Sequence, residues 1–164
     1  MPVRSAGILL YRRGQGGTEG LEVWIAHMGG PFWARKDEHA WSIPKGEYAG
    51  DEDPLTAARR EFAEEMGTPA PPAEYMELGA FRQRSGKVIT AFAAEWDFRP
   101  ELIVSNTFPL EWPRGSGVIN HYPEIDDARW FSEPEARTKL VKGQLPILDA
   151  LVKHVGDSGP AGGL

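Results

Sequence analysis

Three closely spaced glutamates are the residues of this sequence best suited to metal chemistry. Glu61, Glu64 and Glu65 lie in the segment RREFAEEMG at positions i, i+3 and i+4, so their carboxylates would share one face of a helix. On that face they repel one another, and the partially negative end of the helix dipole opposes them further. Magnesium takes carboxylate oxygens, phosphates and water as ligands, and a bound ion would cancel both unfavourable effects. The spacing therefore favours a Mg²⁺ site.

The alternative for the same acids is a solvated helix face whose charges pair with their neighbours. Arg59 and Arg60 precede the acids, whereas the stronger pairs along a helix have the acid first. This order predicts poor local pairing, and it modestly favours the metal site over the solvated face.

A helix over residues 54–66 is predicted to carry the three acids. Asp53 is a suitable N-cap, Pro54 fits the first helical position, and Gly67 ends the helix. On a helical wheel the buried stripe consists of four apolar residues, Leu55, Ala58, Phe62 and Met66. The acids lie beside this stripe rather than opposite it, which places them at the margin of the core, where a cleft can form.

Length and composition indicate one acidic, globular domain. The chain has 164 residues, 41% of them hydrophobic, which supports one compact core over residues 1–155 and a flexible C-terminal tail at 156–164. The net charge of −6 argues against duplex nucleic acid as a partner, because such partners need a basic surface. The chain lacks cysteine and has no apolar run long enough for a membrane span, so we expect a cytoplasmic protein without a membrane partner.

The rest of the sequence predicts a mixture of strands and helices. Strands are expected at residues 5–13, 21–28, 75–98 (as a pair) and 128–132, with a hairpin loop at 14–20. Helices are expected at 133–140 and 145–155, and turns or irregular structure at 45–53 and 99–123. This order predicts an α/β fold in which helices cover both faces of a mixed sheet.

A longer pattern surrounds the three acids, and its fixed positions are Gly46, Glu52, Arg60, Glu61, Glu64, Glu65 and Gly67. This stretch resembles the Nudix box, Gx5Ex7REUxEExGU with U an aliphatic residue, and every fixed position matches. Two departures, Phe62 and Thr68 at U positions, concern packing rather than metal ligands. The resemblance implies a Nudix-type α/β/α sandwich with a mixed sheet between helices.

The resemblance also implies which residues bind metal. In Nudix hydrolases the three helix glutamates bind Mg²⁺ or Mn²⁺, and the carbonyl before the first box glycine is often another ligand. A further glutamate frequently stands shortly before the last strand; Glu124 has that place, and an exposed loop acid is its equal alternative. The expected metal ligands are therefore Glu61, Glu64, Glu65, Lys45 and Glu124.

The expected catalytic group consists of Glu61, Glu64, Arg60 and Glu52. By the resemblance, Glu52 pairs with Arg60 and helps to orient the carboxylates. The chemistry implied is attack of metal-activated water on one phosphorus of a nucleoside diphosphate derivative. The general base is Glu61 or Glu124, and the sequence leaves this choice open.

Residues outside the box indicate a nucleotide substrate. The segment IPKGE resembles the start of the box in dinucleoside polyphosphate hydrolases, although the tyrosine expected in diadenosine hydrolases is missing. Lys45 is also placed to contact phosphate, and Trp33, Arg35 and Lys36 combine a base-stacking ring with positive charges. Three other aromatic residues have a weaker claim on the substrate: Trp41, which is expected in the core, Trp112 and Tyr122.

The predicted function is Mg²⁺-dependent hydrolysis of a pyrophosphate bond in a dinucleoside polyphosphate or a nucleoside triphosphate. One alternative is another diphosphate substrate, such as a nucleotide sugar or an inositol polyphosphate. A second alternative is a nucleotide sensor that binds without cleaving. All the glutamates of the box are present, which favours hydrolysis. Exposed aromatic loops are also compatible with a homodimer.

Overall fold

The computed structural model describes residues 3–14 and 20–157. Its strands are β1 (Arg4–Arg13), β2 (Leu21–Met28), β3 (Trp41–Ser42), β4 (Lys45–Glu47), β5 (Met76–Arg82), β6 (Val88–Glu95), β7 (Thr107–Glu111), β8 (Ile119–Pro123) and β9 (Ile125–Ser132). Its helices are α1 (Pro54–Met66), α2 (Glu133–Lys139), a short 3-10 helix (Lys142–Gln144) and α3 (Leu145–Asp157). Most of the predicted loop at 14–20 and of the predicted tail at 156–164 lies outside the described residues. No helix in the described ranges is long and apolar enough to cross a membrane.

Strand β1 lies at the centre of the main sheet. Within the described residues, seven strands form one mixed sheet in the order β3-β2-β1-β6-β5, with β4 paired to β1 and β9 paired to β2. β1 is antiparallel to β2 and β4 but parallel to β6, in register from Arg4 opposite Val88 to Tyr11 opposite Glu95. Every residue from Ser5 to Tyr11 is buried, as expected for a strand covered on both faces.

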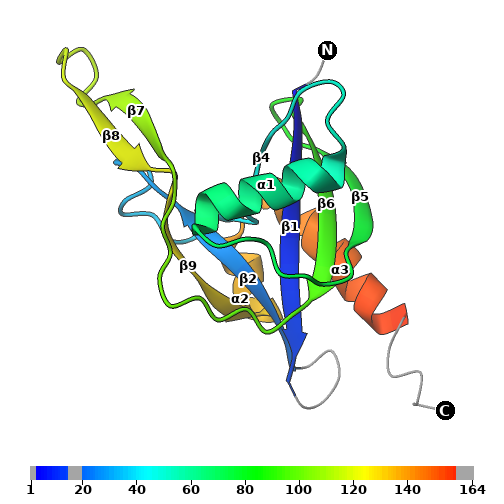
Figure 1. Cartoon of the computed structure of the whole chain (residues 1–164). Helices are drawn as coiled ribbons and strands as arrows, with labels where there is room; N and C mark the ends of the chain where they lie inside the picture. The colour runs from blue at the N-terminus through cyan, green and yellow to red at the C-terminus, as the bar shows by residue number, and fades with distance from the viewer. Residues whose placement is uncertain (1–2, 15–19, 158–164) are drawn as a thin grey trace.

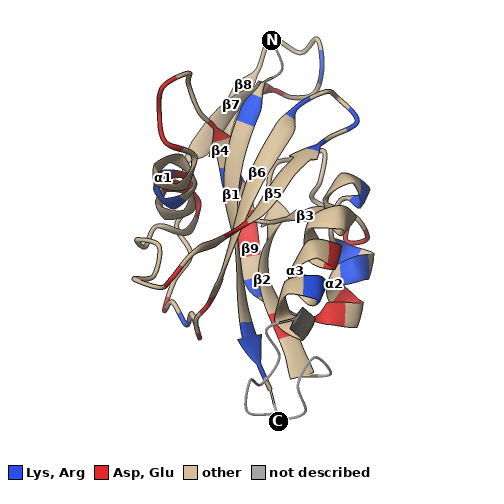
Figure 2. Ribbon diagram, turned by 90° about the vertical axis from the view of Figure 1, so that its right-hand side faces the viewer, with Lys and Arg blue, Asp and Glu red and all other residues tan. Residues whose placement is uncertain are grey.

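Helices cover both faces of this sheet (Figures 1 and 2). Side chains alternate along β1, so Ile8 and Leu10 join the core layer beneath α1, whereas Leu9 joins the layer beneath α3. Phe62 of α1 and Leu148 of α3 are fully buried in these two layers. The arrangement confirms the predicted α/β/α sandwich with a mixed sheet.

The segment 99–123 is more regular than predicted. β7 and β8 form an antiparallel ribbon that is separate from the main sheet, with Thr107 opposite Pro123 and Glu111 opposite Ile119. The prediction of an irregular stretch is therefore wrong for this part of the segment. The prolines and glycines of this segment argued against strands, because both residues are depleted in strands and proline is tolerated mainly at their open edges.

Candidate functional site

Helix α1 carries the three acids at the edge of the core. The Asp53 carboxylate caps the helix by accepting a hydrogen bond of 3.0 Å from the Thr56 N–H, and Gly67 ends the helix with a φ of 75°. Both ends agree with the sequence prediction. Glu61 and Glu65 are only 9% and 7% exposed, although both are carboxylates. They lie at the boundary between the apolar core and the solvent, where the helical wheel places them.

Arg60 connects three carboxylates of the box. Its guanidinium donates to Glu52 through two bonds, Nη2 to Oε1 at 2.9 Å and Nε to Oε2 at 3.1 Å. Its Nη1 donates to Glu61 at 2.8 Å and to Glu64 at 3.4 Å. The hydrogen bond from Arg60 holds the pKa of Glu52 below its usual value, and the bond to Glu52 raises the pKa of Arg60.

These contacts show that the prediction of poor local pairing is wrong. The prediction considers one acid and one base along a helix, whereas a guanidinium has five N–H donors and can serve several carboxylates at once. Arg59, in contrast, points elsewhere, with its guanidinium 5.7 Å from the centre of the Tyr75 ring. The mutual repulsion of Glu61 and Glu64 is thus partly offset by Arg60 within the chain itself.

Glu65 is the acid that the fold disfavours most in its charged form. Its Oε1 accepts a hydrogen bond of 3.2 Å from the Lys45 backbone N–H. Burial nevertheless raises the pKa of Glu65 to about 8, against the attraction of the Lys45 charge and with added repulsion from Glu124 and Glu61. Burial also lowers the pKa of the Lys45 ammonium, with the Glu65 charge acting against this shift. A metal-free chain thus favours a protonated Glu65, and a bound cation would reverse this preference.

Strand β4 brings the start of the box beneath α1. It occupies the beginning of the turn predicted at 45–53 and pairs with β1, so that Gly46 lies opposite Ala6. A Cβ atom at Gly46 would lie 1.9 Å from Glu61 Oε2. Glycine is needed here because the Glu61 carboxylate fills the space where a side chain would begin. Gly46 is therefore part of the cradle that holds Glu61.

A cleft of about 280 Å³ opens beside Glu65. Its lining comes from segments far apart in the sequence: Met28, Gly29, Trp33, Ser42, Lys45, Glu65, Phe108, Glu124 and Ile125. Four residues singled out from the sequence meet in this cleft, namely Trp33, Lys45, Glu65 and Glu124. Glu52, Arg60, Glu61 and Glu64 do not line the cleft, and they form the charged cluster around Arg60.

Glu124 is fixed through its backbone rather than its side chain. Its N–H donates to the Asn106 carbonyl and its own carbonyl accepts from the Gly29 N–H, each at 2.8 Å. Gly29 cannot carry a side chain, because a Cβ atom there would lie 2.0 Å from the Pro123 carbonyl oxygen. Burial, with repulsion from Glu64, raises the pKa of the Glu124 carboxyl. Glu124 is an exposed residue between β8 and β9, as the alternative of a loop acid expects, but it also lines the cleft beside Glu65.

Two residues expected to bind substrate lie outside the cleft lining. Arg35 is exposed on the loop between β2 and β3. Lys36 places its Nζ 3.5 Å from the centre of the Phe32 ring and 5.4 Å from that of Trp33. Lys36 therefore lies next to Trp33, which lines the cleft, but does not line the cleft itself. Trp41 is buried in the core, as expected.

Phe108 is a cleft residue that the sequence analysis did not identify. Its ring packs against Gly30, where a Cβ atom would come within 2.9 Å of Phe108 Cζ. Because the segment was predicted to be irregular, no strand face could be assigned to Phe108. The available signal was its aromatic type within a long loop, which does not distinguish a binding residue from a packing residue.

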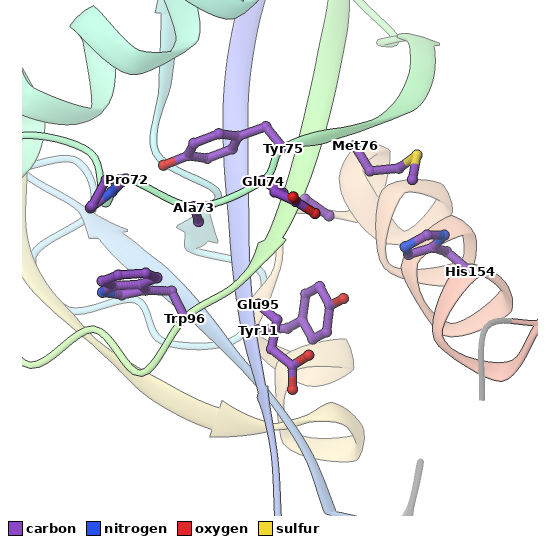
Figure 3. A pocket seen from close by; sticks show the side chains of 10 residues that line it. Tyr11, Pro72, Ala73, Glu74, Tyr75, Met76, Glu95, Trp96 and His154 are labelled. Carbon is purple, nitrogen blue, oxygen red and sulfur yellow. The ribbon is translucent and has the colours of Figure 1, made fainter. Parts of the chain in front are cut away.

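A larger cavity of about 730 Å³ has a different lining (Figure 3). Tyr11, Tyr75, Trp96 and His154 belong to it, and the residues predicted for the metal or substrate do not. The Tyr75 hydroxyl donates to the Pro71 carbonyl at 2.6 Å, so part of the polar lining is already used within the fold. This cavity is therefore not part of the candidate site.

The donor set at α1 fits a hard divalent cation, although the side chains do not form a closed ligand shell by themselves. Within the described ranges, no three acidic or histidine side chains are close enough together to hold an ion alone. Mg²⁺ usually takes one or two carboxylates and completes its shell with substrate phosphates and water. The buried Glu65 carboxyl and the Glu61 carboxylate beside Gly46 provide oxygens of this kind. The residues present thus suit a hard divalent cation that takes its remaining ligands from outside the chain.

Comparisons with known proteins agree with this geometry. A family model of the NUDIX domain matches residues 1–151. No curated protein sequence matches the chain significantly.

Solved structures of similar fold cover nearly the whole chain. A binary complex of C. elegans Ap4A hydrolase has a TM-score of 0.65 and 18% identity, over 94% of this chain and 98% of that chain. The NUDIX domain of Shewanella oneidensis NrtR, complexed with ADP ribose, has a TM-score of 0.64 and 14% identity, over 94% and 89%. RenU, a Nudix hydrolase from M. smegmatis, has a TM-score of 0.59 and 22% identity, over 95% and 86%. At these identities the similarity shows the fold alone.

Proposed function

The chain belongs to the NUDIX domain family and is a pyrophosphohydrolase, and we propose that it hydrolyses a dinucleoside polyphosphate or a nucleoside triphosphate with Mg²⁺. One observation carries the proposal: charged and aromatic side chains line the same cleft. The charged residues are Lys45, Glu65 and Glu124, and the aromatic residues are Trp33 and Phe108. The charged groups suit a phosphate chain with its metal, and the rings suit a base. The hydrolase domain in this proposal spans residues 1–155.

The proposed metal ligands are the carboxylates of Glu61, Glu64, Glu65 and Glu124 and the carbonyl of Lys45, with Mn²⁺ as a substitute for Mg²⁺. Because no three of the described acids lie close enough together to hold an ion alone, they would bind it jointly with phosphate oxygens and water. A bound divalent cation lowers the pKa of water and neutralises charge that develops on phosphate oxygens. Glu65 is the central ligand, because burial disfavours its charge until a cation offsets it.

The other charged residues position these acids and move a proton. Arg60 fixes the directions of Glu61 and Glu64 through its hydrogen bonds, and Glu52 anchors the guanidinium. Glu61 or Glu124 takes the proton from the attacking water, a role that typically contributes about 10²–10⁴-fold. Burial raises the pKa of both carboxyls, which brings them nearer to the pKa that suits a base at neutral pH.

The aromatic walls support a nucleotide as the substrate. Trp33 and Phe108 offer rings on which a base can stack, while Lys45, Lys36 and Arg35 offer positive charge to a polyphosphate. The similar structures include an Ap4A hydrolase and a NUDIX domain complexed with ADP ribose, which supports a ligand of this class. The nucleotide thus lies with its base between the loop after β2 and strand β7, and with its phosphates toward Glu65.

The test is hydrolysis by the purified full chain of a panel of diphosphate compounds, with products separated by anion-exchange chromatography. The panel consists of diadenosine tetraphosphate, ATP, ADP ribose, a nucleotide sugar and an inositol polyphosphate, each with Mg²⁺, with Mn²⁺ and with EDTA. We expect metal-dependent cleavage of the first or second compound and little cleavage of the last two. Arg60→Gln should slow the reaction roughly 10–100-fold, as a residue that orients metal ligands typically does. Arg59→Gln is the matched control.

Three outcomes would contradict the proposal. Binding of a nucleotide without cleavage would indicate a sensor. Faster cleavage of the nucleotide sugar or the inositol polyphosphate would change the substrate class. Cleavage that survives EDTA would remove the metal from the reaction.

A further inference from the structure

The β7–β8 ribbon extends away from the main sheet, as Figure 1 shows. Its register pairs Phe108 with Tyr122 and Leu110 with Asn120, and Trp112 N–H donates to the Val118 carbonyl at 3.0 Å. These six residues share one face, because side chains alternate along each strand. We call this the inner face. The other face, the outer face, contains Thr107, Pro109, Glu111, Ile119, His121 and Pro123.

The two faces differ in burial and in chemistry. On the inner face Phe108, Leu110, Trp112 and Tyr122 are half-buried, and Val118 and Asn120 are exposed. Every residue of the outer face is exposed. The inner face is aromatic, aliphatic or amide in character and carries no charge. The rings of Phe108 and Tyr122 are 6.2 Å apart between centres. The ribbon therefore has an uncharged, mainly apolar face that its own fold covers only in part.

The inner face continues the wall of the catalytic cleft. Phe108 belongs to both, because its ring lines the cleft and packs against Gly30. From Phe108 to Trp112 the strand adds about 14 Å at the usual rise per residue. An apolar surface thus leads from the cleft outward along the ribbon, beyond the space that one nucleoside fills.

We propose that the inner face is a second nucleoside subsite, which stacks the distal base of a dinucleoside polyphosphate. This inference rests on the proposed function, in which the first base lies between Trp33 and Phe108. Trp112 supplies the stacking ring, and the Asn120 amide has both a donor and an acceptor for the edge of a base. The phosphate chain then spans the distance between the two bases, which explains why the apolar surface extends so far from Glu65.

The edges of the ribbon argue against pairing with a strand from a second copy of the chain; a copy that packs on the inner face is an outcome of the test below. The hydrogen bond from Trp112 to Val118 shows that positions 108, 110 and 112 form the hydrogen-bonded pairs with β8. The N–H groups of the outer-face residues therefore point away from the partner strand. Pro109 and Pro123 occupy two of these outward positions and lack an N–H. Both edges are therefore poor templates for a further strand.

The test compares two substrates with the same number of phosphates, diadenosine tetraphosphate and adenosine tetraphosphate, in the Mg²⁺-loaded full chain. In the wild type we expect a KM about tenfold lower for the compound with two bases, since stacking of one base has an effect of this size. Trp112→Leu should raise the KM for diadenosine tetraphosphate by about the same factor, with kcat and the kinetics of adenosine tetraphosphate unchanged. Ile119→Ala, on the exposed outer face of the same ribbon, should change neither.

The outcomes separate the subsite from the proposed function. If the wild type cleaves neither compound, the subsite is wrong, and cleavage of ATP in the panel above decides whether the proposed function fails as well. If it cleaves both with the same KM, or if Trp112→Leu affects both equally, the subsite alone is wrong. Sedimentation of the wild type and the variant provides a second measurement, because a dimer that dissociates in Trp112→Leu would show that another copy covers the inner face.

Discussion

Helices α1 and α3 have the same length of 13 residues and lie against opposite faces of one sheet, yet they bury different side chains. The buried residues of α3 are all apolar: Ile147, Leu148, Leu151 and Val155. Those of α1 include the carboxylates Glu61 and Glu65 beside Phe62 and Met66. The buried residues of α3 thus serve packing alone, whereas α1 gives part of its buried surface to charge.

The difference supports our proposal that the chemistry takes place at α1, on the side of the sheet where the fold buries an unfavourable carboxylate. Burying a carboxylate costs free energy unless a partner offsets it, and here Arg60 and Lys45 offset only part of the charge. The buried residues of α3 include no carboxylate, so this free-energy cost does not arise there. We therefore expect changes in α1 to affect activity far more than stability, and changes in α3 to do the reverse.

The largest effect is expected for Glu65→Gln. Loss of a central ligand removes several kcal/mol of metal-dependent stabilisation, which corresponds to a fall of roughly 10³-fold in kcat/KM. The free energy of unfolding of the metal-free variant should stay the same or rise, because glutamine has no charge to bury and still accepts the hydrogen bond from Lys45. Steady-state kinetics and urea titration measure the two quantities. Glu101→Gln, an exposed acid, is the control, and full Mg²⁺-dependent activity of Glu65→Gln would refute our ligand assignment.

Leu148→Ala should show the opposite behaviour. Leu148 is fully buried beneath the sheet, and truncation of such a residue costs about 2–5 kcal/mol of the free energy of unfolding. Activity per folded molecule should stay within about twofold of the wild type, because the cleft is lined by other residues. Urea titration combined with kinetics well below the unfolding midpoint makes the measurement. A loss of turnover in the still folded variant would show that the α3 layer is coupled to the site.

A smaller effect on activity is expected for Gly46→Ala. The new Cβ would meet the end of the flexible Glu61 side chain, which can rotate away at little cost to folding but then leaves its place in the site. We expect kcat/KM to fall roughly 10–100-fold, as for other disturbances of ligand orientation, with little change in melting temperature. Gly50→Ala is a matched control, since an added Cβ there meets nothing within 4 Å. Unchanged kinetics in Gly46→Ala would mean that the position of Glu61 is unimportant.

The smallest expected effect is the pH dependence of stability without metal. The folded chain holds the pKa of Glu65 at about 8, above the value of about 4.5 for an unfolded chain, so the folded state binds this proton more tightly. The stability contributed by this proton is complete below about pH 4.5 and is lost as pH rises toward 8. We therefore expect the melting temperature of the wild type, relative to Glu65→Gln, to fall between pH 5 and pH 8.5 in EDTA. Mg²⁺ should reverse this fall, and parallel profiles would contradict it.

Local signals in the sequence suffice for α1 but not for the surroundings of its acids. The cap at Asp53, the end at Gly67 and the apolar stripe act within a few residues, so the helix and its acids could be predicted. The contacts of Arg60 with three carboxylates depend on the rotamers of four side chains, and neighbour rules along one helix do not contain this information.

The cleft wall at Phe108 could not be predicted for a related reason. Its position depends on the packing of β7 against Gly30, and these two segments are far apart in the sequence. Prolines in both strands also weakened the strand signal, although they suit the outward positions of an isolated ribbon. The roles that we assign to Trp33, Arg35 and Lys36 stay predictions until substrates are tested.

The parallel pairing of β1 with β6 limits the order in which this protein can assemble. β1 contributes side chains to both core layers, but its parallel partner β6 begins only at Val88, and β9, which pairs with β2, begins only at Ile125. The sheet is therefore complete only after the ribosome has passed these segments. Contacts so distant in sequence form slowly, because a long loop must close first. We therefore expect the nascent chain to form α1 and the local antiparallel pairs β1–β2 and β5–β6 early, and to join them through the distant β1–β6 and β2–β9 pairings last.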